Sequence, residues 1–355
     1  MKLVNVTTTH EERNLLHAAL ADFSQGGARA RYAAWLEARG DQRRAEVVRA
    51  TIEAFHHLSL DAIRHSEDVA DWERMIAVPM LKTFIRATSD YSSDQARALR
   101  DLAFSRLRPA LYMTHAPAPS EPEIGASYLW GLPDMAEGEA WPKTRELSDW
   151  FDARSQIPQD LHCGFLGQIA FADMKDSVLG KELPSFGGFA VFQITEADEL
   201  GIVEVLVRPW ARTAALARRA PPPDLVEDRF GQQINSPQSA HVMELREVLS
   251  LPDARDGPFA KWIPDCGYGE RHEKVYRFLQ DACDADVEDH GGYLGFGGYL
   301  KATSGNDPSL DTQSLRLAVL PSSPEAGLVH FAVPAGDLEL GRLDRVQYVW
   351  NDWDA

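Results

Sequence analysis

Up to about residue 90, apolar residues recur every three to four positions, the spacing that one face of a helix produces. Polar or glycine-containing breaks separate three such stretches, and Arg39-Gly40 ends the second where a helix stop is expected. Short amphipathic helices can bury their apolar faces only against each other, so the pattern predicts a small helical bundle. The three faces comprise Leu15, Leu16, Ala19, Leu20 and Phe23; Tyr32, Trp35 and Leu36; and Val47, Val48, Thr51, Ile52 and Phe55.

A further helix is predicted to begin at Ser92. The stretch Ser92 to Gln95 has the form of a capping box, in which two side chains satisfy free backbone donors at a helix start. We expect this helix to cover 92–108, to end at Pro109 and to lead into a stiff proline-rich connector over 115–122. We place a domain boundary just before Ser92, which gives a helical module over 1–88 and a second domain over 92–355.

Beyond residue 161 the period changes to short β-branched runs bounded by turns, which are typical of strands. These runs form two clusters that share a Leu-Pro-Ser segment after the first strand and a phenylalanine in a glycine-led second strand. The similarity has two explanations, chance or two related β units that pack as a pair. The predicted fold class is α+β, a small N-terminal helical bundle followed by an antiparallel-sheet domain, with a helix over 271–283 between the clusters. The predicted strands are 165–171, 188–194, 202–207, 315–320, 327–333 and 345–350.

The N-terminal helices carry a family resemblance. Tyr32-Ala-Ala-Trp-Leu-Glu-Ala-Arg-Gly-Asp41, preceded by an apolar helix and followed by Arg44-Ala-Glu-Val-Val-Arg49, resembles the bacterial repeat-companion module over about residues 12–55. The chain departs from that pattern at Ala34, where the module has an acidic residue. The module has no established activity, so the resemblance implies an accessory or docking unit.

A second resemblance covers about residues 92–352. Five blocks of residues occur in the order and at the spacing of the YwqG-like family, a group of bacterial proteins of unknown function. The resemblance implies an α+β fold with antiparallel sheets, and it brings no catalytic residues. The blocks are Ser127 with Trp130-Gly131-Leu132-Pro133 and Trp141-Pro142; Phe165-Leu-Gly-Gln-Ile169; Leu183-Pro184 with Gly187-Gly188 and Phe192; Leu294-Gly-Phe-Gly297; and Gly327, Phe331, Val333, Asp337 and Leu338.

Composition narrows the class of protein. Apolar residues make up 44% of the 355 residues, which is enough for packed cores. No apolar run approaches the roughly 20 residues that span a bilayer, and the start of the chain lacks the apolar stretch of a signal peptide. The 3 cysteines lie far apart, which argues against a disulfide scaffold. We therefore expect a cytoplasmic protein with no membrane partner.

The net charge of −18 is concentrated in one part of the chain. Residues 1–120 carry 16 Lys and Arg against 15 Asp and Glu, whereas residues 121–355 carry 20 against 39. Phosphate backbones bind through lysine and arginine, so the acidic part predicts no nucleic-acid partner. It would attract a basic protein instead. The alternative is that the charge serves solubility alone.

No group of residues has the specificity of an enzyme site. The chain has no Gly-x-Ser-x-Gly elbow, and its histidines and cysteines lack the spacing of a zinc clip. The acidic run Asp284–Gly291 lacks the glycine and glutamate positions of an EF-hand, and Gly291–Gly298 lacks the context of a phosphate loop. The sequence thus predicts no catalytic residue, no metal and no cofactor, and leaves enzymatic activity open.

We expect a non-catalytic protein-binding protein whose acidic surface engages a basic partner. The YwqG-like resemblance implies neighbouring toxin genes, which narrows this to a toxin-neutralising (immunity) role. Trp141, between an acidic run and Pro142, is expected to be at least partly exposed, as suits a hot-spot residue. The alternatives are a scaffold that docks through its N-terminal helices, and an enzyme or small-molecule binder with Gln168 and Gly291–Gly298 at a cleft between the β units. The predicted binding residues are Trp130, Asp134, Glu137, Glu139, Trp141 and Gln168.

Overall fold

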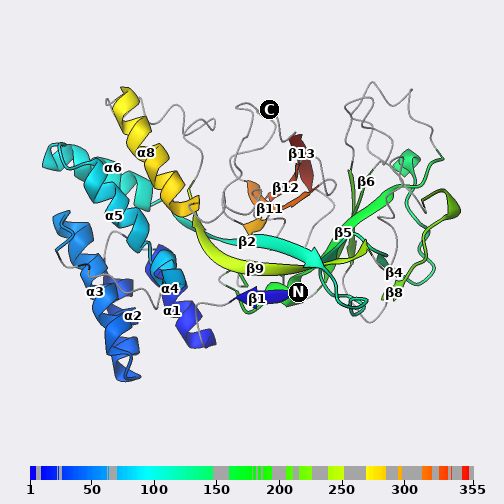
Figure 1. The fold of residues 1–355 in the computed structure, drawn as a ribbon, viewed down its shortest axis with the longest axis horizontal. Coiled ribbons are helices and arrows are strands. Elements are labelled where there is room, and N and C mark those ends of the chain that lie inside the picture. The colour runs from blue at the N-terminus through cyan, green and yellow to red at the C-terminus, as the bar shows by residue number, and fades with distance from the viewer. Residues whose placement is uncertain are drawn as a thin grey trace.

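The structure is a computed structural model, and it confirms the α+β fold: N-terminal helices precede a large, curved, mostly antiparallel sheet (Figure 1). The helices gather at one end of the molecule and the sheet extends away from them (Figure 1). The residues that the structure describes are 1–4, 9–21, 23, 26–61, 63, 70–146, 160–177, 179–180, 183–184, 187–193, 205–210, 216–225, 239–251, 269–284, 295–297, 314–321, 328–334, 337 and 346–351.

The predicted helices form where the apolar periodicity places them, and their apolar faces are buried. The capping box is confirmed: the Gln95 N–H donates to Ser92 Oγ at 3.3 Å, and the Ser92 N–H donates to Gln95 Oε1 at 3.1 Å. Pro79 lies in the first turn of a helix, where its missing N–H costs nothing. The helices are α1 (His10–Ala21), α2 (Gly27–Ala38), α3 (Gln42–His57), α4 (Ala70–Met75), α5 (Val78–Ala87), α6 (Ser93–Phe104) and α8 (Gly269–Asp284).

Tyr32 on α2 joins three other elements through its hydroxyl. This hydroxyl donates to Glu12 on α1 at 2.9 Å and accepts from Arg44 on α3 and from the Trp72 indole on α4, both at 2.9 Å. Burial raises the pKa of the Tyr32 hydroxyl far above its usual range, although Arg44 opposes the shift. A neutral tyrosine therefore satisfies the buried polar groups of the bundle.

The large sheet contains eleven strands within the described residues, in the order β13-β12-β11-β10-β2-β9-β3-β5-β6-β7, and β1 pairs in parallel with β9. β4 and β8 form a separate two-stranded sheet. The strands are β1 (Lys2–Val4), β2 (Arg108–Pro117), β3 (Tyr128–Leu129), β4 (Asp134–Ala136), β5 (Gly164–Ala170), β6 (Gly188–Gln193), β7 (Val205–Trp210), β8 (Leu216–Arg218), β9 (His241–Ser250), β10 (Gly295–Gly297), β11 (Ser314–Pro321), β12 (Leu328–Pro334) and β13 (Gln347–Asn351).

The strand order reveals two interlocked halves. Each half has one long strand, one short strand and a three-stranded antiparallel meander, namely β2, β3 and β5-β6-β7 in the first and β9, β10 and β11-β12-β13 in the second. The long strands are exchanged: β2 pairs with the short strand of the second half, and β9 with that of the first. β2 and β9 pair along their full lengths at the centre, from Arg108↔Ser250 to Pro117↔His241. Each half therefore completes the sheet of the other.

The two predicted β units are both present, and each first strand carries a bulge. The register shifts between Phe165 and Gly167 in β5 and between Arg316 and Ala318 in β11. These matching bulges support two related units. We expected the two units to pack against each other as a pair. In the sheet they are separated instead, because β10, β2, β9 and β3 lie between them.

The expected connector over 115–122 is wrong in its first part, because residues 115–117 end strand β2. The predicted helix also stops earlier, since α6 ends at Phe104. β2 was missed because it has prolines at 109 and 117 and only one β-branched residue, Thr114, so it lacks the composition by which the other strands were predicted. β9 was missed as well.

One hydrophobic core spans the predicted boundary between 88 and 92. It contains residues of α1 to α6, of α8 and of both halves of the sheet, from Leu16 to Val333. α8, which follows β9 in the chain, packs against α5, and β1 adds the N-terminus to the edge of β9 (Figure 1). The two-domain division stays a prediction, but the parts share a core.

A smaller second core lies on the other face of β5 and β6. Leu166 and Val191 point into the main core, whereas their neighbours Phe165 and Phe192 belong to the second core. Because successive side chains in a strand point to opposite faces, both faces of this strand pair are covered. Among the described residues, no helix is long and apolar enough to cross a membrane.

Leu245 tests the central strand pair. Leu245→Ala removes a fully buried side chain of β9, and we expect the free energy of unfolding in urea to fall by about 2–5 kcal/mol. The control Val248→Ala trims a half-buried side chain on the opposite face of the same strand, and about 1 kcal/mol or less is expected. Equal losses for the two variants would contradict the assignment of the buried face.

Candidate functional site

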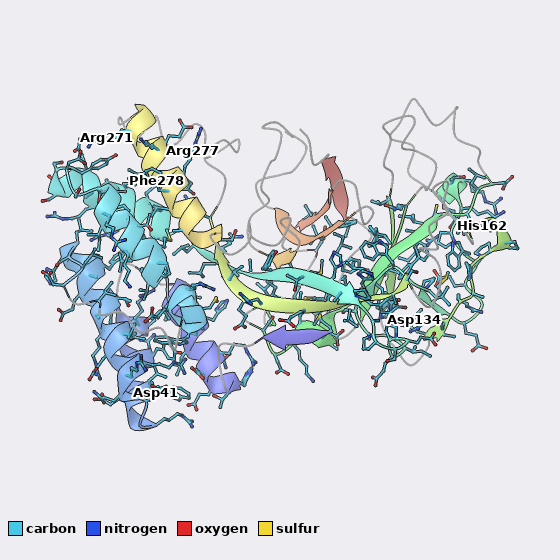
Figure 2. The ribbon with its side chains drawn as sticks, viewed as in Figure 1. Asp41, Asp134, His162, Arg271, Arg277 and Phe278 are labelled. Carbon is cyan, nitrogen blue, oxygen red and sulfur yellow. The ribbon has the colours of Figure 1, made fainter. Side chains whose placement is uncertain are left out.

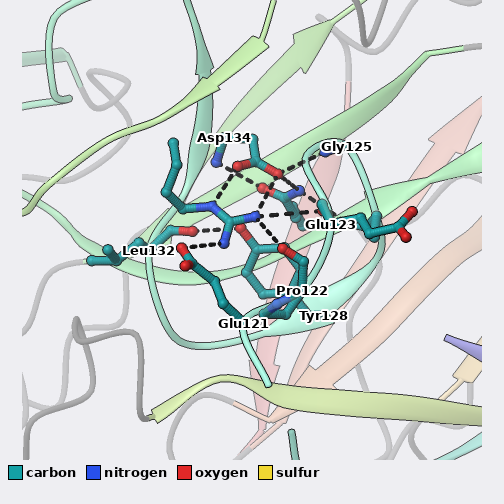
Figure 3. A network of polar contacts seen from close by, with 10 residues as sticks. Glu121, Pro122, Glu123, Gly125, Tyr128, Leu132 and Asp134 are labelled. Atoms are coloured by element: carbon teal, nitrogen blue, oxygen red, sulfur yellow. Dashed lines mark hydrogen bonds and ion pairs between the residues drawn. The ribbon is translucent and has the colours of Figure 1, made fainter. Parts of the chain in front are cut away.

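The segment between β2 and β3 contains a short acidic stretch, Glu121–Gly125, which we call the acidic loop. Its backbone turns where the Ala126 N–H donates to the Glu123 carbonyl at 3.1 Å. Gly125 has a φ of 78°, in the left-handed region that glycine adopts without strain. The Gly125 N–H donates to Oδ2 of Asp134 at 2.8 Å, which ties the loop to the buried start of β4 (Figure 3).

Asp134 is the central acceptor of this network. Arg218 on β8 donates from Nε to Oδ1 at 2.6 Å and from Nη2 to Oδ2 at 3.3 Å, a two-point pairing that fixes both side chains. Gln168 on β5 donates from Nε2 to Oδ2 of Asp134 at 2.7 Å, and its Oε1 accepts from the Asp134 N–H at 2.9 Å. Asp134 and Gln168 are buried. The network is thus a buried joint between β4, β5 and β8.

The rest of the Arg218 guanidinium holds the acidic loop (Figure 3). Nη1 donates to Glu121 Oε1 at 2.8 Å, and Nη2 donates to the carbonyls of Pro122 at 2.9 Å and Glu123 at 3.4 Å. These bonds reach backbone atoms as well as a side chain. The conformation of the loop is therefore set by the buried network.

The Tyr128 ring packs against the Arg218 guanidinium. Its ring centroid lies 5.3 Å from the guanidinium carbon, and its hydroxyl donates to the Leu132 carbonyl. Burial, and then the negative charge of Asp134, raises the pKa of the Tyr128 hydroxyl far above its usual range. Burial lowers the pKa of the Arg218 guanidinium. The hydrogen bond to Asp134 and the nearby negative charges raise it by more, so the pKa lies above its usual value. Arg218 therefore stays charged.

The outer side of the acidic loop lies in solvent. The Glu121 side chain is 55% exposed and Ile124 is 54% exposed. Glu123 is exposed too, and it forms no ion pair within the described residues. Phe278 is the other large apolar side chain exposed in the described part of the chain, and it lies on α8 at the opposite end of the molecule from Asp134 (Figure 2). The acidic loop thus presents an exposed isoleucine next to two exposed glutamates.

Two residues from the blocks of the family resemblance, Ser127 and Gly131, hold the chain in place on either side of β3. Ser127 Oγ accepts from the Ala170 N–H at 2.8 Å, which pins the start of β3 to the end of β5. Gly131 has a φ of 83°, and a Cβ at this position would lie 2.9 Å from the Cβ of Ala240. Only glycine fits there without displacing the neighbouring chain. These residues have structural roles in this chain.

Trp141 is buried, so the expectation that it is partly exposed is wrong. Its side chain is 9% exposed, its indole N–H donates to the Cys163 carbonyl at 2.7 Å, and its ring meets Phe192 edge-on at 5.8 Å. A large ring whose only donor is satisfied is more stable inside the second core than in water. Trp141 therefore stabilises the second core and is not a surface contact residue.

The structure places the predicted binding residues in different environments. Asp134 and Gln168 contact each other, and Gln168 also donates to the Ala126 carbonyl at 2.8 Å. Because its amide is engaged and buried, Gln168 does not line the mouth of a cleft. Residues 291–294 and 298 of the expected cleft loop lie outside the described residues. Of the remaining predicted residues, Trp130 is buried, Glu137 is exposed and Glu139 is half-buried. The Glu139 carboxylate accepts from the Ala136 N–H at 3.1 Å and lies 3.9 Å from the Arg208 guanidinium.

Trp130 lies beside a pair of histidines. Nδ1 of His115, on β2, is 3.0 Å from Nδ1 of His241, on β9, and the Trp130 ring meets both imidazoles edge-on. Burial lowers the pKa of His115, and the neighbouring His241 lowers it further. Burial likewise lowers the pKa of His241. Both imidazoles are therefore neutral at pH 7.

Sequence reasoning missed Arg218 and the acidic loop itself. Arg218 is separated from Asp134 by 84 residues, and nothing in its local sequence indicates a buried partner. The loop had a usable signal, because an isolated isoleucine follows the Glu-Pro-Glu run with which the proline-rich connector ends. The histidine pair had none, since it depends on the unpredicted strands β2 and β9.

No protein-family model matches the chain, and no curated protein matches it either. The resemblances to the YwqG-like family and to the repeat-companion module therefore stay predictions that rest on their motifs. Among the described residues, no group of three or more His, Cys, Asp or Glu side chains is arranged to hold a metal ion.

Removing the Asp134 carboxylate tests the buried joint. Asp134→Ala leaves Arg218 without its buried partner, and we expect the free energy of unfolding to fall by about 3–5 kcal/mol. The control Asp160→Ala removes a carboxylate that is 79% exposed and lies 3.2 Å from Arg145, so little change is expected in the same urea titration. A small effect of Asp134→Ala, similar to that of the control, would show that the network does not hold this region together.

Proposed function

We propose that this chain is a non-catalytic protein-binding protein and that the acidic loop is its contact surface for a basic protein. The observation that carries the proposal is Ile124, a large apolar side chain that is 54% exposed and directly follows Glu121-Pro122-Glu123. An apolar anchor with a charged rim is the usual composition of a binding hot spot.

The fixed conformation of the loop supports this role. A flexible loop loses conformational entropy when it binds, and that loss subtracts from the affinity. Arg218 and Asp134 already hold the backbone at Pro122, Glu123 and Gly125. Asp134 and Gln168, which the sequence indicated as contact residues, act in this proposal as positioning residues.

The charge of the region supports a basic partner. The chain has an excess of acidic residues after residue 120, and the exposed Glu121 and Glu123 of the acidic loop are among them. Opposite charges accelerate encounter and exclude acidic competitors. Neutralisation of a basic toxin is the narrowest form of this proposal. It requires a complementary surface and no catalytic residue.

Site-specific crosslinking tests the proposal. A photoreactive amino acid at position 124 is expected to capture one basic protein in the native host, which mass spectrometry identifies. The same group at His57, an exposed position at the end of α3, is the control and is expected to capture none of it. Equal capture at both positions, or capture of an acidic protein at position 124, would contradict the proposal.

Affinity for the captured protein gives the second test. We expect the triple variant Glu121→Gln, Glu123→Gln, Ile124→Ser to bind at least about 30-fold more weakly, as loss of about 2 kcal/mol at a hot spot implies. The control Glu37→Gln, Glu46→Gln removes the same amount of charge from the exposed faces of α2 and α3 and is expected to bind normally. Unchanged affinity of the triple variant would exclude the acidic loop as the contact surface.

A further inference from the structure

The exchange of long strands creates a second feature, a pair of imidazoles at one end of the β2–β9 ladder. His115 lies opposite Met243 and His241 lies opposite Pro117, so the histidines are diagonal neighbours on one face of the sheet. Their Nδ1 atoms face each other at 3.0 Å. The two side chains come from strands that are 126 residues apart in sequence.

Trp130 holds the two rings in place. Its ring centroid lies 5.1 Å from that of His115 and 4.6 Å from that of His241, at interplanar angles of 87° and 85°. Trp130 is itself fixed, because it is 2% exposed and its backbone N–H donates to the Leu166 carbonyl at 2.8 Å. It has a φ of 53°, an uncommon conformation for a large side chain. Trp130 therefore keeps the two imidazoles next to each other in the metal-free protein.

We propose that Nδ1 of His115 and Nδ1 of His241 together bind a divalent transition metal of the Cu²⁺ or Ni²⁺ class. Two nitrogen ligands about 2.0–2.1 Å from a metal lie about 2.9 Å apart at a right angle and about 3.3 Å apart at the tetrahedral angle. The observed 3.0 Å fits the right angle, which is typical of square-planar and tetragonal Cu²⁺ and Ni²⁺ sites.

The contact between the two Nδ1 atoms at 3.0 Å is a hydrogen bond, so one Nδ1–H donates to the other Nδ1 in the metal-free protein. On metal binding that proton moves to Nε2 of the same ring, and both rings turn so that each Nδ1 lone pair points at the metal instead of at the other nitrogen; no net proton is released. Both histidines are half-buried, and water supplies the remaining coordination positions. The protein thus supplies two adjacent nitrogen ligands to a cation that keeps its other water ligands.

Trp130 provides the readout. Cu²⁺ quenches the fluorescence of an indole in contact with its ligands, so titration with Cu²⁺ alone is expected to give saturable quenching at one equivalent. Electron paramagnetic resonance is expected to show two equatorial nitrogens. We expect Ni²⁺ to bind more weakly than Cu²⁺, and Mg²⁺ not to compete.

Variants locate the site. His115→Gln and His241→Gln are each expected to weaken Cu²⁺ binding at least about tenfold and to abolish the quenching, because two joined ligands bind far better than one. His57→Gln, which removes an exposed imidazole from α3, is expected to leave the Cu²⁺ affinity and the fluorescence quenching unchanged. Trp130→Phe is expected to retain binding by resonance while the quenching is lost. Near-ultraviolet circular dichroism of each variant checks that it is folded.

Two results would overturn the proposal. One is quenching or a two-nitrogen signal that persists in folded His115→Gln protein. The other is the absence of a saturable one-equivalent site in the wild-type chain at micromolar Cu²⁺. Neither result bears on the acidic loop, which lies on a different segment and has its own binding test.

Discussion

The pairing of β2 with β9 is the constraint on which the rest of the structure depends. Backbone donors and acceptors that leave water must find partners, and in this chain each half of the sheet obtains them from the long strand of the other half. The same ladder carries β1 on its edge and brings His115 beside His241. Helices and sheet then close over one shared core.

In the acidic loop, a buried ion pair fixes the conformation of exposed residues. An isolated ion pair in a protein interior adds little stability, because desolvation offsets the attraction between the charges. Arg218 instead divides its donors between Asp134, inside the fold, and the backbone of the loop. The ion pair therefore fixes the geometry of exposed residues, which is the property that a binding surface requires.

Much of the fold could be predicted from sequence, because amphipathic periodicity reports burial on one face. This works for α1, α2 and α3. The six strands of the two meanders were predicted by a second signal, β-branched runs bounded by turns. Both signals fail for β2, which contains two prolines and a single β-branched residue, and the apolar alternation of β9 is interrupted by the buried Glu247. The site depends on contacts such as Asp134 with Arg218, which local patterns do not encode. Trp141 was misjudged because an acidic neighbourhood in sequence says nothing of the core beneath it.

Cleavage of the chain between Leu225 and Ser239 tests the exchange of strands most directly, because it separates β2 to β8 from β9 to β13. Amide hydrogen exchange of β2 and β9 is the measurement. If each half needs the long strand of the other, amide hydrogens exchange slowly in the cleaved but associated protein and fast in each purified fragment, and slow exchange returns when the fragments are mixed. Slow exchange of β2 in the isolated N-terminal fragment would contradict it, because that half would then complete its sheet without β9.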